Sequence, residues 1–301
     1  MKLGQLPIFA AAALLVCGVS CSQPSSDGAA VLRFTAIPDD NATELQAKFE
    51  PVAAYLSESL GVDVSYIPTA SYAASVEAFR NGDIQLAWFG GLTGVQARSQ
   101  VSGAVAIAQG KVDPNYHSYF IAHIDAGFSA VDPTAASGQF PMALGGKSFT
   151  FGSPSSTSGR LMPEHFIRLN TGQSPTDFFG TEDAFSGSHD KTVALVAAGT
   201  FEAGAVSYKT YDRMVAEGKV DPAVCQVIWV SPNYPDYNFT AHPSLDGQFG
   251  EGFTKRLQSA LVGMTDPALL SAVMRKEGLI AATNKDFEPV RELAEKLGFL
   301  R

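Results

Sequence analysis

The sequence is short of cysteine, of charge and above all of cations. Three cysteines occur in 301 residues, charged residues make up 17%, and 21 lysines and arginines face 30 acidic residues. So few cysteines exclude a disulfide framework, and a net charge of -9 argues against a nucleic-acid-binding surface. Apolar residues still make up 46%, and the length suits two domains of about 100–200 residues, so packed globular domains are expected.

Common nucleotide-binding and metal-binding motifs are also missing. The segment 145–148 (GGKS) looks like the end of a phosphate-binding loop, but Pro141 stands where that loop needs its first glycine. The segment also precedes a predicted strand instead of following one. The histidines form no HExxH or cysteine-paired pattern, so we expect neither a metal site nor a cofactor.

The N-terminus has the architecture of a secretory signal. Lys2 precedes an apolar run from Leu6 to Val19, shorter than the roughly 20 residues that a membrane helix needs. We expect residues 1–20 to be a signal peptide and residues 21–30 a polar tether. The signal ends in GVSC, which resembles the lipobox of bacterial lipoproteins and would make Cys21 a lipidated residue; the alternative is an ordinary secretory signal with an incidental cysteine. Cys225, within VCQVIWV, is expected to be a buried, unpaired thiol in a strand.

Strands and helices alternate along the chain. Residues 31–37, 62–68 and 84–89 are rich in β-branched and apolar side chains and predict strands, and a helix follows each of them. One face of the first helix, which should end at Gly61, carries Leu45, Phe49, Val52, Leu56 and Leu60. We interpret GGLT (90–93) as a turn. The alternation predicts parallel sheets covered by helices, with ligands bound beyond the carboxyl ends of the strands.

A second strand–helix series begins near residue 147, after a Gly, Ser, Pro and Asp-rich stretch from Asp125 to Gly146. It predicts strands at 148–151, 203–207 and 224–230. Helices are predicted after the serine-rich loop, at 192–199 and at 208–218, and mostly helical material follows residue 238. This change of composition indicates entry into a second domain.

The stretch SPSSTSGRLMP, Ser153 to Pro163, lies between a predicted strand and a predicted helix. Such a loop presents unpaired backbone N–H groups and the positive end of the helix dipole, and hydroxyl groups add further donors, so it suits a small oxyanion. The alternative is a well-capped helix start in a serine-rich loop. Pro163 would fall beyond the first turn of a helix begun at Ser158, which requires an irregular start.

This loop resembles the Ser-Thr-Ser-Gly loop of the phosphate/phosphite/phosphonate-binding (PhnD-like) proteins of ABC importers. Over about residues 32–238 the agreeing segments are AIPDDNATELQAKFEPVAAYLSESLG, SYAASVEAF, DIQLAWFGGLTGVQA, SGSHDKTVALVAAG and VIWVSPNYPDYNF. AWFGGLTGVQAR and YPDYNFT are most similar to the selenate-binding subgroup. The resemblance implies a two-domain type II periplasmic binding protein fold, an α/β fold with mostly parallel sheets and the ligand in the interdomain cleft. Domain 1 would span 31–122 plus 232–301, and domain 2 would span 123–231.

The resemblance also assigns the ligand contacts, which are Tyr72, Phe89, Ser156, Thr157, Ser158, His189, Asp236 and Tyr237. The serines and threonine would hold the oxyanion with help from His189, and Tyr72 would reach it from the other domain. Phe89 stands where the family has a tyrosine, so one hydroxyl donor is lost. Taken alone, Tyr72 and Phe89 would also fit core aromatics, and His189 with Asp190 would fit a surface pair.

Asp236 bears on which anion binds. A carboxylate can face an oxyanion only if the anion carries a proton to donate, as phosphate or phosphonate can at neutral pH and selenate or sulfate cannot. The acidic partner that aminophosphonate binders use is not evident around Tyr208.

The leading hypothesis is an exported, monomeric solute-binding protein that closes on a small oxyanion and delivers it to an ABC permease with its ATPase. The protein would work in the periplasm or at the outer face of the cytoplasmic membrane, anchored there by the lipid, and it would not be an enzyme. One alternative passes the signal to a membrane sensor kinase instead of a permease. The other is a serine hydrolase using Ser156 or Ser158 with His189 and Asp190, although adjacent His and Asp cannot easily align and no GxSxG elbow exists.

Overall fold

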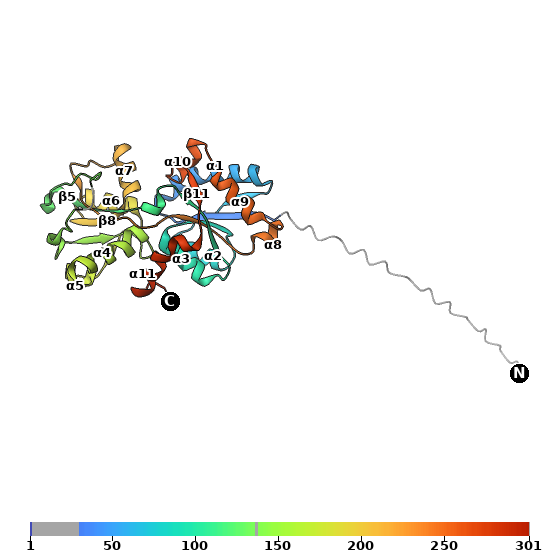
Figure 1. Cartoon of the computed structure of the whole chain (residues 1–301), viewed down its shortest axis with the longest axis horizontal. Helices are drawn as coiled ribbons and strands as arrows, with labels where there is room; N and C mark the ends of the chain where they lie inside the picture. The colour runs from blue at the N-terminus through green and yellow to red at the C-terminus, as the bar shows by residue number, and fades with distance from the viewer. Residues whose placement is uncertain (2–29, 136–137, 301) are drawn as a thin grey trace.

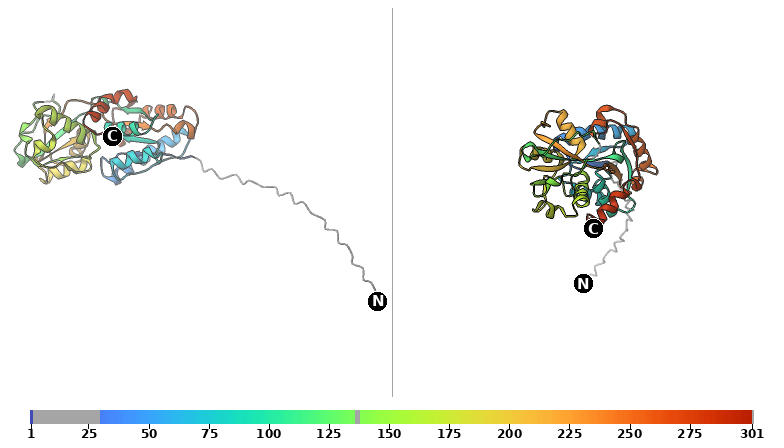
Figure 2. Two further views of the ribbon diagram at one scale, coloured as in Figure 1. Left: turned by 90° about the horizontal axis from the view of Figure 1, so that it is seen from below. Right: turned by 60° about the vertical axis from the view of Figure 1, so that its left-hand side comes forward.

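The computed structural model describes Met1 and residues 30–135 and 138–300, so the expected signal peptide and Cys21 lie outside the described residues. The chain forms two lobes, each built around one β-sheet, and the lobes lie side by side along the long axis (Figures 1 and 2). Within the described residues, no helix combines the length and the apolar character needed to cross a bilayer.

The first lobe has a six-stranded sheet in the order β11-β4-β10-β3-β1-β2. Its strands are β1 (Leu32–Ala36), β2 (Val64–Tyr66), β3 (Leu86–Phe89), β4 (Val105–Gly110), β10 (Asn238–Ala241) and β11 (Leu279–Ala281). Strands β1 to β4 point one way, whereas β10 and β11 run antiparallel to their neighbours. The sheet is therefore mixed, with most of its strands pointing in one direction.

Helices pack around this sheet. They are α1 (Ala42–Leu60), α2 (Tyr72–Arg80), α3 (Gly91–Gln100), α8 (Leu245–Phe249), α9 (Phe253–Val262), α10 (Pro267–Ala272) and α11 (Glu288–Lys296), with the 3₁₀ turns η1 (Asp113–Asn115) and η5 (Asn284–Phe287). Helix α1 begins and ends as the sequence predicts. The Asn41 side chain accepts hydrogen bonds from the first-turn N–H groups, and Gly61 takes the left-handed conformation (φ 67°) that ends the helix.

The second lobe has a five-stranded sheet in the order β7-β6-β8-β5-β9. Its strands are β5 (Ser118–His123), β6 (Phe149–Phe151), β7 (Ala184–Phe185), β8 (Ala203–Ser207) and β9 (Cys225–Val230). Its helices are α4 (Met162–Thr171), α5 (Pro175–Phe179), α6 (His189–Ala197) and α7 (Tyr208–Ala216), with the short turns η2 (Ile124–Ala126), η3 (Met142–Leu144) and η4 (Thr157–Leu161). Only β5 opposes the direction of the other strands.

The chain passes between the lobes twice, and the two crossings lie together. The first runs from β4 through η1 to β5, the second runs from β9 to β10, and Tyr116 and Tyr234 form an antiparallel bridge between them. Strand β5 pairs with β8 and β9, so the first crossing precedes Ser118, earlier than the expected boundary at 122/123.

The cores of the lobes are apolar and rich in aromatic rings. Cys225 is fully buried in β9 and, within the described residues, is a free thiol; burial raises its pKa to about 12, so it stays protonated. The expectation of a buried, unpaired thiol is confirmed. Helices α8 to α11 come from the tail, which is mostly helical as expected, but β10 and β11 also come from it and complete the first sheet.

Candidate functional site

Chain segments that follow the carboxyl ends of strands in both lobes meet at the junction between the lobes. Residues 37–40 follow β1, residues 90–92 follow β3, and residues 152–158 follow β6. Asp236 precedes β10, whose reversed direction brings its start to the same edge of the sheet. The sequence prediction of where to search for the site therefore agrees with the topology.

The serine-rich loop is shaped by a π-helical turn, η4. The Leu161 N–H donates to the Ser156 carbonyl at 3.0 Å, and the Ser156 hydroxyl caps the turn by accepting from the Gly159 N–H at 3.0 Å. Because α4 itself begins at Met162, Pro163 falls in its first turn, where a missing N–H is tolerated. This wide turn is the irregular start that Pro163 requires.

The N-terminus of α3, in the first lobe, lies directly against this loop. The Leu92 N–H donates to the Thr157 hydroxyl at 2.9 Å, and the Gly91 N–H donates to Asp236 Oδ1 at 2.8 Å. A Cβ on Gly90 would lie 3.2 Å from Thr157 Oγ1, so glycine permits this approach. The interpretation of GGLT as a turn is therefore wrong: the helix begins at Gly91, and its Leu92 amide binds Thr157 of the other lobe.

His189 opens α6 and holds a neutral imidazole. Its Nδ1 accepts from the Ser207 N–H at 3.3 Å, which leaves the ring proton on Nε2, 3.3 Å from the Ser158 hydroxyl. Burial lowers the pKa of His189 to about 4, so the ring stays neutral near pH 7 and acts as a hydrogen-bond donor. The Asp190 carboxylate accepts from Ser188 instead of the imidazole, so the geometry of a hydrolase triad is absent.

Asp236 and Tyr72 each aim a polar atom into the same buried region without a partner. The hydroxyl of Tyr72 and Oδ2 of Asp236 are buried, and no group among the described residues hydrogen-bonds to either atom. Burial raises the pKa of Asp236 to about 7, although hydrogen bonds from the Gly91 N–H and the Thr157 hydroxyl stabilise the carboxylate and partly lower that pKa. Buried polar atoms normally have partners, so this pair indicates a place for a ligand.

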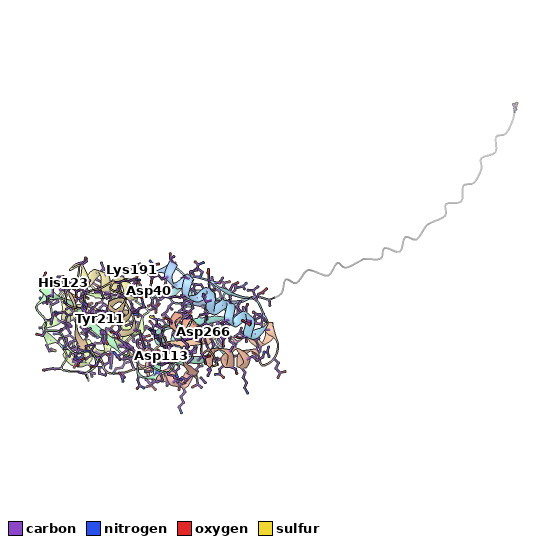
Figure 3. All side chains as sticks on the ribbon, turned by 90° about the horizontal axis from the view of Figure 1, so that it is seen from above. Asp40, Asp113, His123, Lys191, Tyr211 and Asp266 are labelled. Carbon is purple, nitrogen blue, oxygen red and sulfur yellow. The ribbon has the colours of Figure 1, made fainter. Side chains whose placement is uncertain are left out.

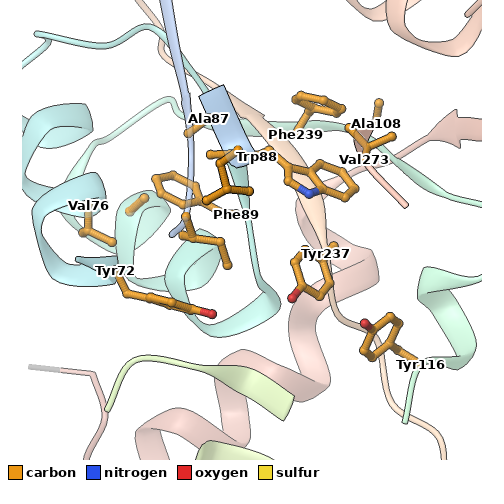
Figure 4. Packing of buried hydrophobic residues seen from close by; sticks show 14 of the residues in the cluster. Tyr72, Val76, Ala87, Trp88, Phe89, Ala108, Tyr116, Tyr237, Phe239 and Val273 are labelled. Atoms are coloured by element: carbon orange, nitrogen blue, oxygen red, sulfur yellow. The ribbon is translucent and has the colours of Figure 1, made fainter. Parts of the chain in front are cut away.

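A second carboxylate, Asp39, lies on the first-lobe side. Its backbone carbonyl accepts a hydrogen bond from the backbone N–H of His189 at 3.2 Å, and this bond joins the two lobes. Its carboxylate accepts from the Tyr237 hydroxyl at 2.8 Å. Burial raises the pKa of Asp39 to about 6. The hydroxyls of Tyr72 and Tyr237 are directed toward one another in Figure 4.

Behind the tyrosines lies a buried cation that the sequence analysis did not find. Arg275 forms a fully buried ion pair with Asp113, at 2.7 Å from Nη2 to Oδ1, and its guanidinium lies 4.7 Å from the Tyr237 ring centre. Trp88 stacks on Tyr237 with a centroid distance of 5.5 Å. Arg275 and Asp113 are far apart in sequence, so no local pattern could have joined them.

The sequence-predicted residues are therefore brought together, with one qualification. Ser156, Thr157, Ser158, His189, Asp236, Tyr72 and Tyr237 are all at most 2% exposed around the lobe junction. Phe89 is fully buried and packs edge-on against Phe79 of α2, at 5.7 Å between centroids, so its contact with a ligand stays a prediction.

The sequence analysis missed the amides of Gly91 and Leu92, although two glycines between a strand and a helix could have signalled them. Within the described residues, no three His, Cys, Asp or Glu side chains gather as a metal site.

Comparisons with known proteins identify the family. Residues 34–287 match the profile of the phosphonate ABC transporter, periplasmic substrate-binding protein family. The chain is 36% identical over 285 residues to a Prochlorococcus marinus (strain MIT 9301) protein described as a probable ABC transporter phosphite binding protein PhnD1, covering 93% of this chain and 94% of the relative. It is 26% identical to the phosphate-import protein PhnD of Mycolicibacterium smegmatis, covering 89% and 86%.

The fold agrees with a solved relative. The solved structure of PhnD1 from Prochlorococcus marinus (MIT 9301) in complex with methylphosphonate, 36% identical in sequence, superposes with a TM-score of 0.83, covering 89% of this chain and 98% of that one. The expected α/β, two-lobe type II architecture is thus confirmed. The family comprises extracytoplasmic binding proteins of importers and not enzymes. This chain belongs to the periplasmic substrate-binding proteins of phosphonate ABC transporters.

Proposed function

We propose that the protein captures a small phosphorus oxyanion that keeps an acidic proton, such as phosphite, phosphate or a short phosphonate, and delivers it to an ABC permease. The anion would lie between η4 and the N-terminus of α3. Its donors would be the Ser158 hydroxyl, His189 Nε2 and the Tyr72 hydroxyl, with no lysine or arginine in direct contact. The Thr157 hydroxyl, which donates to Asp236 in this structure, would turn to the anion on binding.

The observation that carries this proposal is Oδ2 of Asp236, which has no hydrogen-bond partner among residues 30–135 and 138–300. It is buried, and the carboxyl pKa of about 7 means that ionising it beside another negative charge is unfavourable. A ligand with its own P–OH group can donate to that oxygen, whereas sulfate and selenate at neutral pH have no proton to give. The names of the relatives, which refer to phosphite, phosphate and methylphosphonate, support the same chemistry.

We further propose that the two lobes are domains that open and close about the paired crossings beside Tyr116 and Tyr234. The Leu92–Thr157 and His189–Asp39 hydrogen bonds form only when the lobes meet. Closure would then exclude water and strengthen each hydrogen bond to the anion.

A calorimetric panel tests the ligand class. Phosphite, phosphate, methylphosphonate and 2-aminoethylphosphonate should include at least one tight ligand, whereas sulfate and selenate should bind at least about a hundredfold more weakly, a loss of about 3 kcal/mol. Tight binding of selenate at pH 7.5 would contradict the proposal and favour the selenate-binding subgroup.

The proposal also covers the membrane anchor and the oligomeric state of the protein. We propose that Cys21 is lipidated and that the protein acts as a monomer at the outer face of the cytoplasmic membrane. The sequence resemblance of GVSC to a lipobox supports the anchor. Metabolic labelling with a fatty-acid analogue should mark the wild type, and Cys21→Ala should abolish the label.

A further inference from the structure

A network of ion pairs joins the lobes on the side of α1 and α7. Arg213 of α7 lies 2.7 Å from Asp40, which precedes α1, and 3.8 Å from Glu44 in the first turn of α1. Lys219, just after α7, lies 2.8 Å from Glu44. We call Arg213, Lys219, Asp40 and Glu44 the interlobe ion-pair network. Figure 3 shows Asp40 at the end of α1 that faces the second lobe.

The central pair of this network is shielded from water. The Asp40 side chain is 4% exposed and that of Arg213 is 15% exposed, whereas Lys219 and Glu44 are 45% and 39% exposed. Burial alone would raise the pKa of Asp40, but Lys48 and Arg213 outweigh it and hold the pKa below its ordinary value. The Asp40–Arg213 pair should therefore contribute more than an exposed pair, which contributes little.

Each member of the network also has a partner within its own lobe. Arg213 and Lys219 both contact Glu217, at 2.8 and 3.1 Å, and Asp40 and Glu44 both contact Lys48, at 3.0 and 3.8 Å. Separating the lobes would therefore leave none of these charges isolated. Such an arrangement avoids the large cost of an uncompensated buried charge and suits a contact that must form and break repeatedly.

The network is coupled to the site through the chain. Asp40 directly follows Asp39, whose carbonyl accepts from the His189 N–H and whose carboxylate binds the Tyr237 hydroxyl. On the η4 side the lobes meet through apolar burial and the Leu92–Thr157 hydrogen bond, because Leu161 lies in a buried cluster with residues of α3 and α11. The ion pairs of the network lie on the α1 and α7 side of the junction.

We propose that Arg213 is a positioning residue for ligand capture, which touches no ligand and raises affinity by stabilising the closed lobes through Asp40 and Glu44. The inference rests on the proposed function as far as the ligand is concerned. When a ligand binds only the closed form, its apparent affinity is proportional to the fraction of protein molecules in that form. Loss of the network should therefore act mainly on the dissociation rate.

The test compares Arg213→Met, which keeps an apolar stem of similar length, with wild-type protein. Methylphosphonate affinity should fall about tenfold at about 50 mM NaCl, with faster dissociation. Raising NaCl to about 0.5 M should weaken the wild type more than the variant, because salt screens the network. Lys219→Met, at an exposed position, should cost about twofold and provides a second variant should Arg213→Met fold poorly.

Arg291→Met is the matched control. Arg291 makes its ion pairs with Glu288 and Glu295 inside α11, so its loss removes the same charge but breaks no ion pair between the lobes, and affinity should stay within twofold of wild type. Equal affinity, dissociation rate and salt dependence in Arg213→Met and wild type would overturn the inference.

Small-angle scattering of the ligand-free protein separates this inference from the proposed function. Arg213→Met should be more extended than wild type at low salt, and the two should converge at high salt. If wild type binds none of the oxyanions, the proposed function fails, and identical scattering of variant and wild type at every salt concentration would then reject the network.

Discussion

Replacing Asp236 by asparagine should change how ligand affinity depends on pH. Asp236 Oδ1 accepts from the Gly91 N–H, Oδ2 is buried with no partner in the part of the chain that the structure describes, and the pKa is about 7 instead of 3.8. A difference of that size means that ionising the buried carboxyl costs about 4 kcal/mol more than ionising it in water. A ligand oxygen facing Oδ2 therefore needs a proton between the two groups.

The direction in which affinity changes with pH follows from that shared proton. Below pH 7 the carboxyl or the ligand supplies it, and wild-type affinity should be constant. Above pH 7 binding must take up one proton, so affinity should fall by up to about tenfold per pH unit. Asp236→Asn offers an amide N–H that needs no proton, so its affinity should fall less steeply above pH 7 than that of wild type. Its sulfate binding should improve about tenfold or more, as expected for a hydrogen bond to a charged group.

Calorimetry in two buffers of different ionisation enthalpy counts the proton directly. At pH 9, where the carboxyl and methylphosphonate are both largely ionised, wild type should take up close to one proton per ligand bound and Asp236→Asn clearly less. Asp125→Asn, at an exposed side chain, should behave as wild type. Proton uptake of zero in wild type, with parallel pH profiles for both proteins, would refute the reasoning.

Further predictions concern the contacts around the anion. Thr157→Ala should weaken binding by about 1–3 kcal/mol through a lost charge-assisted hydrogen bond; unchanged affinity in calorimetry would remove Thr157 from the site. Tyr72→Phe should weaken binding about tenfold while leaving the ligand-free melting temperature unchanged or higher, because its buried hydroxyl has no partner among the described residues; a lower melting temperature would contradict that account. Gly90→Ala places a Cβ 3.2 Å from Thr157 Oγ1 and should reduce affinity at least about tenfold with a native circular dichroism spectrum, and an unaffected affinity would show that the lobes tolerate a wider separation.

The parts of the fold that the sequence predicts well are those set by neighbours in the chain. The start and end of α1 follow from the Asn41 cap, the apolar face and the left-handed Gly61, all of which are local. Strand β3 was predictable because it is buried on both faces and continuously apolar.

The missed elements depend on distant partners. Strand β10 (NFTA) has four residues and exists because β3 and β4 pair with it on either side. The start of α3 at Gly91 also depends on distant partners: the two glycines permit it, but Asp236 and Thr157 of the other lobe stabilise it.

The candidate site also contains residues that the sequence could predict and residues that it could not. The hydroxyl loop Ser156 to Ser158 was predictable from its composition and its place after a strand, and Asp236 from the family resemblance. Asp39, Arg275 and the Asp40–Arg213 pair were not, because each is defined by residues more than a hundred positions away. Burial, and not spacing, gives them their chemistry.

The place of β10 has a consequence for biogenesis. This strand fills the middle of the first sheet, between β3 and β4, yet it is made only after the whole second lobe. During synthesis from the N-terminus, the second lobe, which is one continuous segment, can therefore fold first. Strands β3 and β4 of the first lobe keep unpaired edges until residue 241 has been made. Truncations that end before β10 should leave the first lobe aggregation-prone and the second lobe folded.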